Sequence, residues 1–101
     1  MLAVKKAEYK DNYRLNVSFS DGSAGTVDLS DLLLSDSRAC VKELTDKRMF
    51  KSFYVDHDTV VWENGVDFAP EFLFYRAFEN EEQYQEQFEQ WGYVQELTTT
   101  I

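Results

Sequence analysis

The side chains of this sequence that could do chemistry are few, and most of them stand in predicted turns. The only histidine, His57, lies between Asp56 and Asp58, and such neighbours favour the charged imidazole. Three adjacent side chains in a tight turn cannot all point at one metal ion, so we interpret this tripeptide as an exposed turn. The only cysteine, Cys40, falls on the apolar side of a predicted helix, which favours a buried and inert thiol.

Carboxylates offer a second possible chemistry. Five of them fall between positions 56 and 71: Asp56, Asp58, Glu63, Asp67 and Glu71. Paired carboxylates could act as acid and base or hold Mg²⁺, although acidic residues are also ordinary in turns and at helix starts. We favour the structural interpretation, and a small enzyme or metal- or ligand-binding domain using carboxylates near Asn64-Gly65 is the alternative. No catalytic residue, metal site or cofactor is predicted.

Gly22-Ser23-Ala24-Gly25 has neither the spacing of a nucleophile elbow nor the lysine of a phosphate-binding loop. The segment instead belongs to a predicted antiparallel meander. Its strands are expected at Leu2–Tyr9, Tyr13–Phe19 and Ala24–Leu29, with turns at Lys10-Asp11-Asn12 and Asp21-Gly22. The second strand has the clearest pattern, because Tyr13, Leu15, Val17 and Phe19 share one face.

Short helices and further strands are predicted after the meander. The helical segments are Ser30–Leu34, Arg38–Leu44 with Asp36 or Ser37 as its cap, and Asp46–Phe50 anchored by Met49 and Phe50. Strands are expected at Ser52–Val55 and Thr59–Trp62, on either side of the Asp56-His57-Asp58 turn. The spacing of Cys40, Val41 and Leu44 gives the second helix an apolar side.

The segment Trp62–Glu71 has the strongest local signals. Asn64-Gly65 predicts a type I′ hairpin, in which both central residues have positive φ, followed by a strand through Phe68. Pro70 then predicts the first position of a helix that runs to about Phe78, with Glu71 at the positive end of the helix dipole.

A C-terminal helix with its own start signal is predicted after residue 79. Asn80 is expected to cap it, with Gln83 reaching back, and Gly92 to end it. Its aromatic stripe consists of Tyr84, Phe88 and Trp91, which packs on the sheet or binds a partner. The segment Tyr93–Ile101 is rich in β-forming residues and is either a terminal strand or frayed.

Charge divides the 101-residue chain, whose net charge is −9. Residues 1–77 hold thirteen acidic and ten basic side chains, whereas residues 78–101 hold six glutamates and no lysine or arginine. This excess of negative charge disfavours binding to nucleic acid and favours binding to a small basic protein. The alternative is that the glutamates only form a solvated helix face. No apolar run approaches the roughly 20 residues that span a bilayer, so we expect a cytoplasmic protein without membrane contact.

Several motifs resemble those of a known family in their order and spacing. They are Phe19-Ser20-Asp21-Gly22, Val27-Asp28-Leu29, Val55-Asp56, Trp62-Glu63-Asn64-Gly65-Val66-Asp67 and Pro70-Glu71. Over about residues 2–77 they resemble domain-of-unknown-function family 2442, a small bacterial family. The resemblance implies a cytosolic α+β protein without established activity, often one half of a two-gene pair similar to a toxin–antitoxin module. Some relatives carry a helix-turn-helix domain after this one. Here an acidic, aromatic segment without a basic recognition helix takes that place, so a DNA-binding role does not carry over.

The sequence thus predicts an α+β fold, with a curved antiparallel sheet of five or six strands, two or three short helices and a C-terminal helix. Residues 1–78 form the predicted domain, and residues 79–101 form an acidic aromatic extension. The predicted function is a non-catalytic interaction module, antitoxin-like, that binds a small basic protein or itself. Tyr84, Phe88 and Trp91 are its candidate partner-binding residues. The motif residues with a predicted structural role are Asp21, Gly22, Trp62, Asn64, Gly65, Asp67, Pro70 and Glu71.

Overall fold

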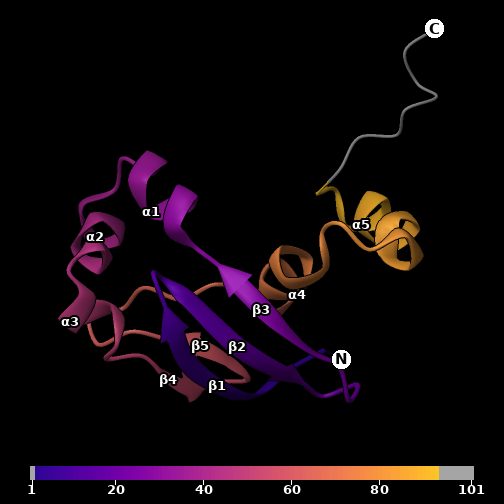
Figure 1. Ribbon diagram of the computed structural model, residues 1–101, viewed down its shortest axis with the longest axis horizontal. Coiled ribbons are helices and arrows are strands. Elements are labelled where there is room, and N and C mark those ends of the chain that lie inside the picture. The colour runs from indigo at the N-terminus through magenta and orange to yellow at the C-terminus, as the bar shows by residue number, and fades with distance from the viewer. Residues whose placement is uncertain (1, 94–101) are drawn as a thin grey trace, which may run out of the picture.

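The computed structural model describes residues 2–93 and confirms the α+β class (Figure 1). A three-stranded antiparallel sheet contains β1 (Val4–Asp11), β2 (Arg14–Phe19) and β3 (Ala24–Asp28) in that order. The helices that follow it are α1 (Ser30–Ser35), α2 (Ala39–Lys42), the 3₁₀ turn η1 (Glu43–Thr45) and α3 (Lys47–Phe50). The remaining elements are the hairpin β4 (Tyr54–Asp56) and β5 (Thr59–Val61), then α4 (Pro70–Phe78), the 3₁₀ turn η2 (Glu82–Tyr84) and α5 (Gln85–Trp91).

The strands differ from the single predicted sheet of five or six. Within residues 2–93 there are five strands in two sheets, because β4 and β5 pair only with each other. The predicted strand through Phe68 is reduced to one antiparallel bridge between Val61 and Asp67. The hairpin lies beside the start of β1, where the N–H of Val4 donates to the carbonyl of Asp58 at 2.8 Å.

The alternation in β2 is confirmed and orients the main sheet. Leu15, Val17 and Phe19 are buried, while Asn16 on the opposite face is exposed and accepts a hydrogen bond from Thr26. Helix α4 covers the buried face beside β3 (Figure 1). The helix approaches so closely that a Cβ built on Gly25 would lie 3.1 Å from the Phe78 ring. A side chain at position 25 would therefore require the Phe78 ring to move by a few tenths of an ångström.

The type I′ assignment at Asn64-Gly65 is wrong. Of these two residues only Gly65 has positive φ, +91°, and its N–H donates to the carbonyl of Trp62, giving a type I turn followed by a left-handed glycine. The turns with two consecutive positive φ values are Asn12-Tyr13 at 44° and 67°, and His57-Asp58 at 50° and 66°. Asn, Asp and His tolerate this region better than most residues, and two-residue hairpin loops require it.

One aromatic core joins the elements around Trp62. Its side chain is fully buried, with ring centroids 5.7 Å from those of both Phe50 and Phe68, and its indole N–H donates to the carbonyl of Phe50 at 2.7 Å. The predicted apolar side of residues 38–44 is only partly correct. Val41 and Leu44 are buried, but Cys40 is exposed, so the predicted buried thiol is wrong.

The predicted helix caps need correction. Helix α2 starts after Arg38, which makes no side-chain cap, so neither Asp36 nor Ser37 is the N-cap. Asp36 nevertheless accepts the backbone N–H of Arg38 at 2.9 Å. Helix α3 does have a cap, because Asp46 accepts the N–H of Arg48.

The C-terminal helix forms as predicted but starts differently. Asn80 does not cap it; instead the amide of Gln85 donates to the carbonyls of Glu79 and Glu81 at 2.9 Å each. Gly92 ends it with φ +86°, and the N–H of Tyr93 closes the turn onto the carbonyl of Phe88, as in a Schellman motif. Residues 94–101 of the predicted terminal strand lie outside the described residues.

We expect Gly65→Val to lower the free energy of unfolding by about 1–3 kcal/mol, because a β-branched residue is strained at positive φ. No atom lies within 4 Å of the added Cβ position, so the loss reports backbone strain rather than a clash. Urea unfolding measures it, with Gly65→Asn as the control, since Asn tolerates the left-handed region. Equal midpoints for Gly65→Val and the wild type would contradict the observed turn.

We expect Phe88→Ala to lower the free energy of unfolding by about 3–5 kcal/mol, because truncating a fully buried phenylalanine leaves a cavity. Gln87→Ala on the exposed side of the same helix should change it by less than about 0.5 kcal/mol. Urea unfolding of both variants compares them. A Phe88→Ala protein as stable as Gln87→Ala would show that α5 is not docked on the core in solution.

Candidate interaction surface

Helix α5 turns its aromatic stripe towards the body of the molecule. Phe88 is fully buried, with its ring centroid 5.0 Å from that of Tyr75. Tyr84 and Trp91 are half-buried at the edges of this contact, with ring centroids 4.9 and 5.9 Å from that of Phe74. Of the three candidate partner-binding residues, Phe88 is therefore enclosed in this chain's own core, and only Tyr84 and Trp91 retain accessible surface.

The opposite side of this segment carries carboxylates. We define the α5 acidic face as four exposed glutamates on η2 and α5 and just before them: Glu81, Glu82, Glu86 and Glu89. The sequence has no lysine or arginine after Arg76, so no basic side chain of this segment can neutralise them. None of the ion pairs within residues 2–93 includes any of these glutamates. Their charge is available to a partner.

A basic surface lies around α3, at the end of the molecule opposite α5 (Figure 1), and was missed from the sequence. Five of the ten basic residues fall between positions 38 and 51: Arg38, Lys42, Lys47, Arg48 and Lys51. In α3 and directly after it, the Nζ atoms of Lys47 and Lys51 lie 6.0 Å from the Tyr13 ring centroid and 4.8 Å from the Tyr9 ring centroid. The high local content of lysine and arginine was visible in the sequence. The position of two of these lysines over the rings of Tyr13 and Tyr9 depends on the fold.

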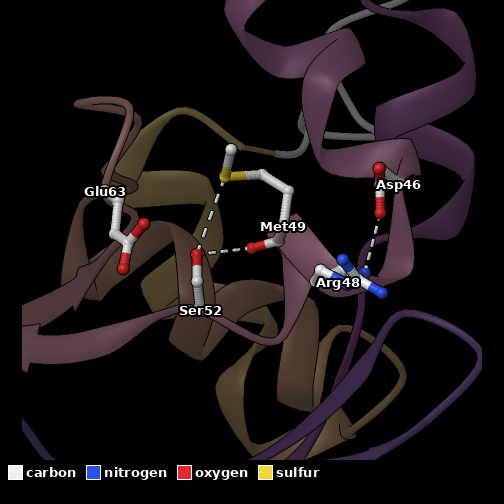
Figure 2. Close-up of a pocket in the computed structure, with 5 residues that line it drawn as sticks. All are labelled: Asp46, Arg48, Met49, Ser52 and Glu63. Atoms are coloured by element: carbon white, nitrogen blue, oxygen red, sulfur yellow. Dashed lines mark hydrogen bonds between the residues drawn. The ribbon is translucent and has the colours of Figure 1, made fainter.

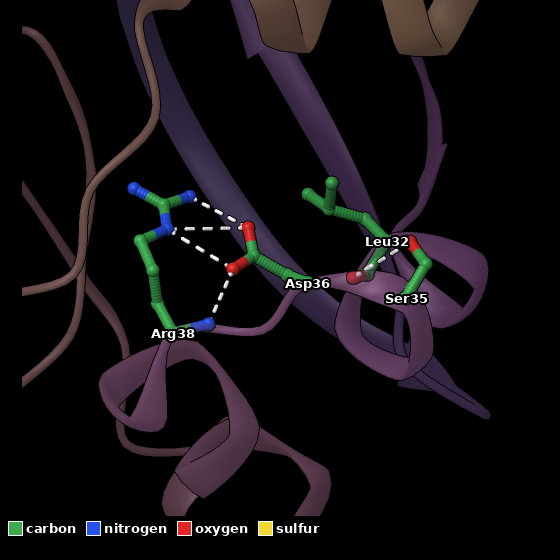
Figure 3. Close-up of polar contacts among 4 residues, drawn as sticks. All are labelled: Leu32, Ser35, Asp36 and Arg38. Carbon is green, nitrogen blue, oxygen red and sulfur yellow. Dashed lines mark hydrogen bonds and ion pairs between the residues drawn. The ribbon is translucent and has the colours of Figure 1, made fainter.

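Arg38 is already neutralised inside the molecule. Figure 3 shows its guanidinium against the carboxylate of Asp36, with the Nη2 to Oδ2 distance at 2.7 Å. Hydrogen bonds from the Arg38 side chain, and then from its backbone N–H, lower the pKa of Asp36 to about 2. The pair leaves Lys42, Lys47, Arg48 and Lys51 as the basic side chains between positions 38 and 51 that form no ion pair within residues 2–93.

The motif residues around Asn64 have structural contacts. The side-chain amide of Asn64 donates to the carbonyl of Cys40 at 2.9 Å and to Oε1 of Glu43 at 2.7 Å, and its oxygen accepts the N–H of Val66. The Trp62–Gly65 turn is thereby joined to α2 and η1. These bonds, together with the buried Trp62, account for two residues of the motif by folding alone.

The other motif residues also stand at turns and helix starts. Asp21 accepts from the backbone and hydroxyl of Ser23 at 2.9 and 2.6 Å, which lowers the pKa of its carboxyl, and Gly22 follows with φ +90°. Pro70 begins α4 and Glu71 lies in its first turn. Asp67 is exposed at the bridge to Val61.

The carboxylates proposed for chemistry are not gathered into one site. His57 lies in an exposed turn, as the sequence predicts, with 87% of its side chain accessible and Nε2 3.5 Å from the Asp56 carboxylate. Among residues 2–93 no three histidine, cysteine or acidic side chains are grouped as metal ligands. Of the five acidic residues between 56 and 71, Glu63 belongs to the lining of the pocket between α3 and the Trp62–Gly65 turn.

That pocket has a volume of about 350 Å³ and lies between α3 and the Trp62–Gly65 turn (Figure 2). Its lining residues are Asp46, Arg48, Met49, Ser52 and Glu63. The Ser52 hydroxyl is 2.6 Å from the Met49 carbonyl, to which it donates, and Asp46 accepts the backbone N–H of Arg48. The sequence did not indicate this pocket, because its walls come from segments that only the buried Trp62 brings together.

The fold is similar to that of a protein of known structure. The crystal structure of a putative DNA-binding protein from Nitrosomonas europaea matches with a TM-score of 0.68 and 18% sequence identity over 93% of this chain. This chain spans 63% of that protein, and the likeness at such identity shows the fold alone. No curated protein matches the sequence. Among the residues that the structure describes, no helix has the length and apolar character needed to cross a membrane.

The family assignment rests on most of the chain. A family model described as a protein of unknown function, DUF2442, matches residues 4–79. The matched segment contains the buried Trp62, the bonds of Asn64 and the whole of α4. The chain therefore belongs to the DUF2442 family of proteins of unknown function.

Proposed function

We propose that this protein is a non-catalytic interaction module and that its α5 acidic face binds a small basic protein. The observation that carries the proposal is the two-sided character of the C-terminal helix. Phe88 fixes one side in the core, and the other side presents four exposed glutamates without an internal counter-charge. The proposed setting is a cytoplasmic two-gene system of the toxin–antitoxin kind.

Electrostatics and shape both support a protein partner. Uncompensated carboxylates on a fixed helix raise the rate of encounter with a positively charged surface and select against acidic partners. Tyr84 and Trp91 border the glutamates and are half-buried, so a partner can complete their burial without unfolding the helix. Tyrosine and tryptophan are the residues most often found as energetic anchors at interfaces.

Nucleic acid is a less suitable partner, although the solved neighbour from Nitrosomonas europaea is described as a putative DNA-binding protein. Duplex binding depends on neutralising several phosphates with lysine and arginine. This chain has a net charge of −9, and its basic stretch between positions 38 and 51 offers only Lys42, Lys47, Arg48 and Lys51 without ion pairs in the described residues. The proposal therefore does not include DNA binding.

The proposal predicts that a basic protein from the native cell is retained by the wild type and lost by an α5 variant. The variant replaces Glu81, Glu82, Glu86 and Glu89 with Gln, and the matched control neutralises four other exposed carboxylates, Glu8, Asp56, Glu63 and Asp67. With the purified partner, calorimetry should show binding that is about fourfold to several hundredfold weaker for the α5 variant, since exposed pairs contribute roughly 0.2–1 kcal/mol each. Equal binding by both variants would remove the α5 acidic face from the interface.

The proposal also predicts that the protein forms no sequence-dependent complex with duplex DNA at physiological salt, because its charge opposes phosphate contact. An electrophoretic mobility shift with the wild type at sub-micromolar concentration, against specific and scrambled duplexes, tests this. A shift that depends on the DNA sequence and is lost in Lys47→Glu/Lys51→Glu would overturn the exclusion of nucleic acid.

A further inference from the structure

The basic side chains of α3 form a second charged surface that the proposed function does not use. We define the α3 basic face as Lys47, Arg48 and Lys51, all exposed and all without an ion pair within residues 2–93. Lys47 and Lys51 are four positions apart, so they lie on the same side of the helical turn, over the rings of Tyr13 and Tyr9. The aromatic rings beneath the two ammonium groups attract them weakly.

The α5 acidic face has the matching spacing with the opposite charge. Glu82, Glu86 and Glu89 are separated by four and three positions, which places them along one side of η2 and α5. The two faces cannot meet within one molecule, because α3 and α5 lie at opposite ends with the sheet and α4 between them (Figure 1). Each molecule therefore carries one acidic and one basic face, and these two faces can only pair between different molecules.

We propose that the α3 basic face of one copy binds the α5 acidic face of a second copy, in a head-to-tail contact. This inference rests on the proposed function for the role of the α5 acidic face as a binding surface, and it goes beyond that function in naming a second copy of the chain as the occupant. The contact is heterologous, so it closes into a ring or extends as a chain, depending on the rotation between copies. The ends of an open chain keep one acidic and one basic face for other partners.

The net charge of −9 does not by itself prevent this contact. Charges in water are screened over about 8 Å at physiological ionic strength, so the charge near each face dominates when two copies meet. Between positions 38 and 51 the local balance is five basic residues against the acidic Glu43 and Asp46, whereas residues 78–93 contain only acidic charges. The same screening makes the contact sensitive to added salt.

Sedimentation velocity on the full-length chain tests the contact by exchanging the charges. The wild type should show a sedimentation coefficient that rises with protein concentration at about 0.1 M salt and does not rise at about 1 M salt, where the screening length is about 3 Å. Lys47→Glu/Lys51→Glu and Glu86→Lys/Glu89→Lys should each stay monomeric alone. An equimolar mixture of the two variants should associate again, because each then offers the other a face of opposite charge.

A control variant, Lys5→Glu/Lys10→Glu, makes the same charge change on exposed residues of β1 and should associate like the wild type. Thermal unfolding of every variant checks that loss of association is not loss of folding. The inference is overturned if the wild type is monomeric at every concentration or if the two charge-exchanged variants fail to associate when mixed. Wild-type binding to a duplex that is lost in Lys47→Glu/Lys51→Glu, without self-association, would assign the α3 basic face to nucleic acid instead.

The outcome is separable from that of the proposed function. If a basic protein still requires Glu81, Glu82, Glu86 and Glu89 while the wild type stays monomeric, only the head-to-tail contact fails. If the charge-exchanged variants associate when mixed but no basic protein depends on the α5 acidic face, the partner is a second copy alone. Failure of both measurements removes α5 from any interface.

Discussion

The burial of Trp62 anchors the end of α3, the helix that begins the α3 basic face. Its indole N–H reaches the carbonyl of Phe50 at the end of α3, while its own backbone closes the turn that contains Asn64. Asn64 then bonds to α2 and η1, which adds to the burial of Val41, Leu44 and Phe50 in holding short helices that are each too brief to be stable alone. The positions of Lys47 and Lys51 over the sheet, and the pocket beside Glu63, both follow from this attachment.

Aromatic contacts also connect the sheet, α4 and α5 at the other end of the molecule. Phe74 of α4 packs on Phe19 of the sheet and also contacts the stripe of α5, with ring centroids 5.2 Å and 4.9 Å from those of Phe19 and Tyr84. Arg76 fixes α4 further, because its guanidinium donates to the carbonyl of Asp28 and pairs with Asp31. That pairing lowers the pKa of Asp31 and ties α1 to α4. Helix α5 therefore rests on a helix that is itself held on both sides.

Local signals predicted those parts of the fold that depend on neighbours in sequence. The alternation in β2 gave its buried face, Pro70 gave the first residue of α4, and Gly92 gave the end of α5. The exposure of Cys40 was missed because helical spacing says which residues share a side, not whether a neighbouring turn covers it. The turn at Asn64 was misassigned because the same dipeptide also fits a type I turn with the glycine one position later. The pocket, and the position of Lys47 and Lys51 over Tyr13 and Tyr9, depend on contacts between distant segments, which no local pattern contains.

The family match and the core end at different places, which bears on how the acidic segment works. The family model stops at residue 79, yet Phe88 is as deeply buried as any core residue of the matched segment. An extension that only displayed charge would need no such anchor, since glutamates on a flexible tail can also attract a basic surface. Docking instead holds Glu82, Glu86 and Glu89 on helical turns at fixed spacing, and in the proposed function this reduces the conformational entropy lost on binding. The buried ring of Phe88 thus determines how firmly α5 is docked, and the docking of α5 determines how closely the spacing of the exposed glutamates is maintained.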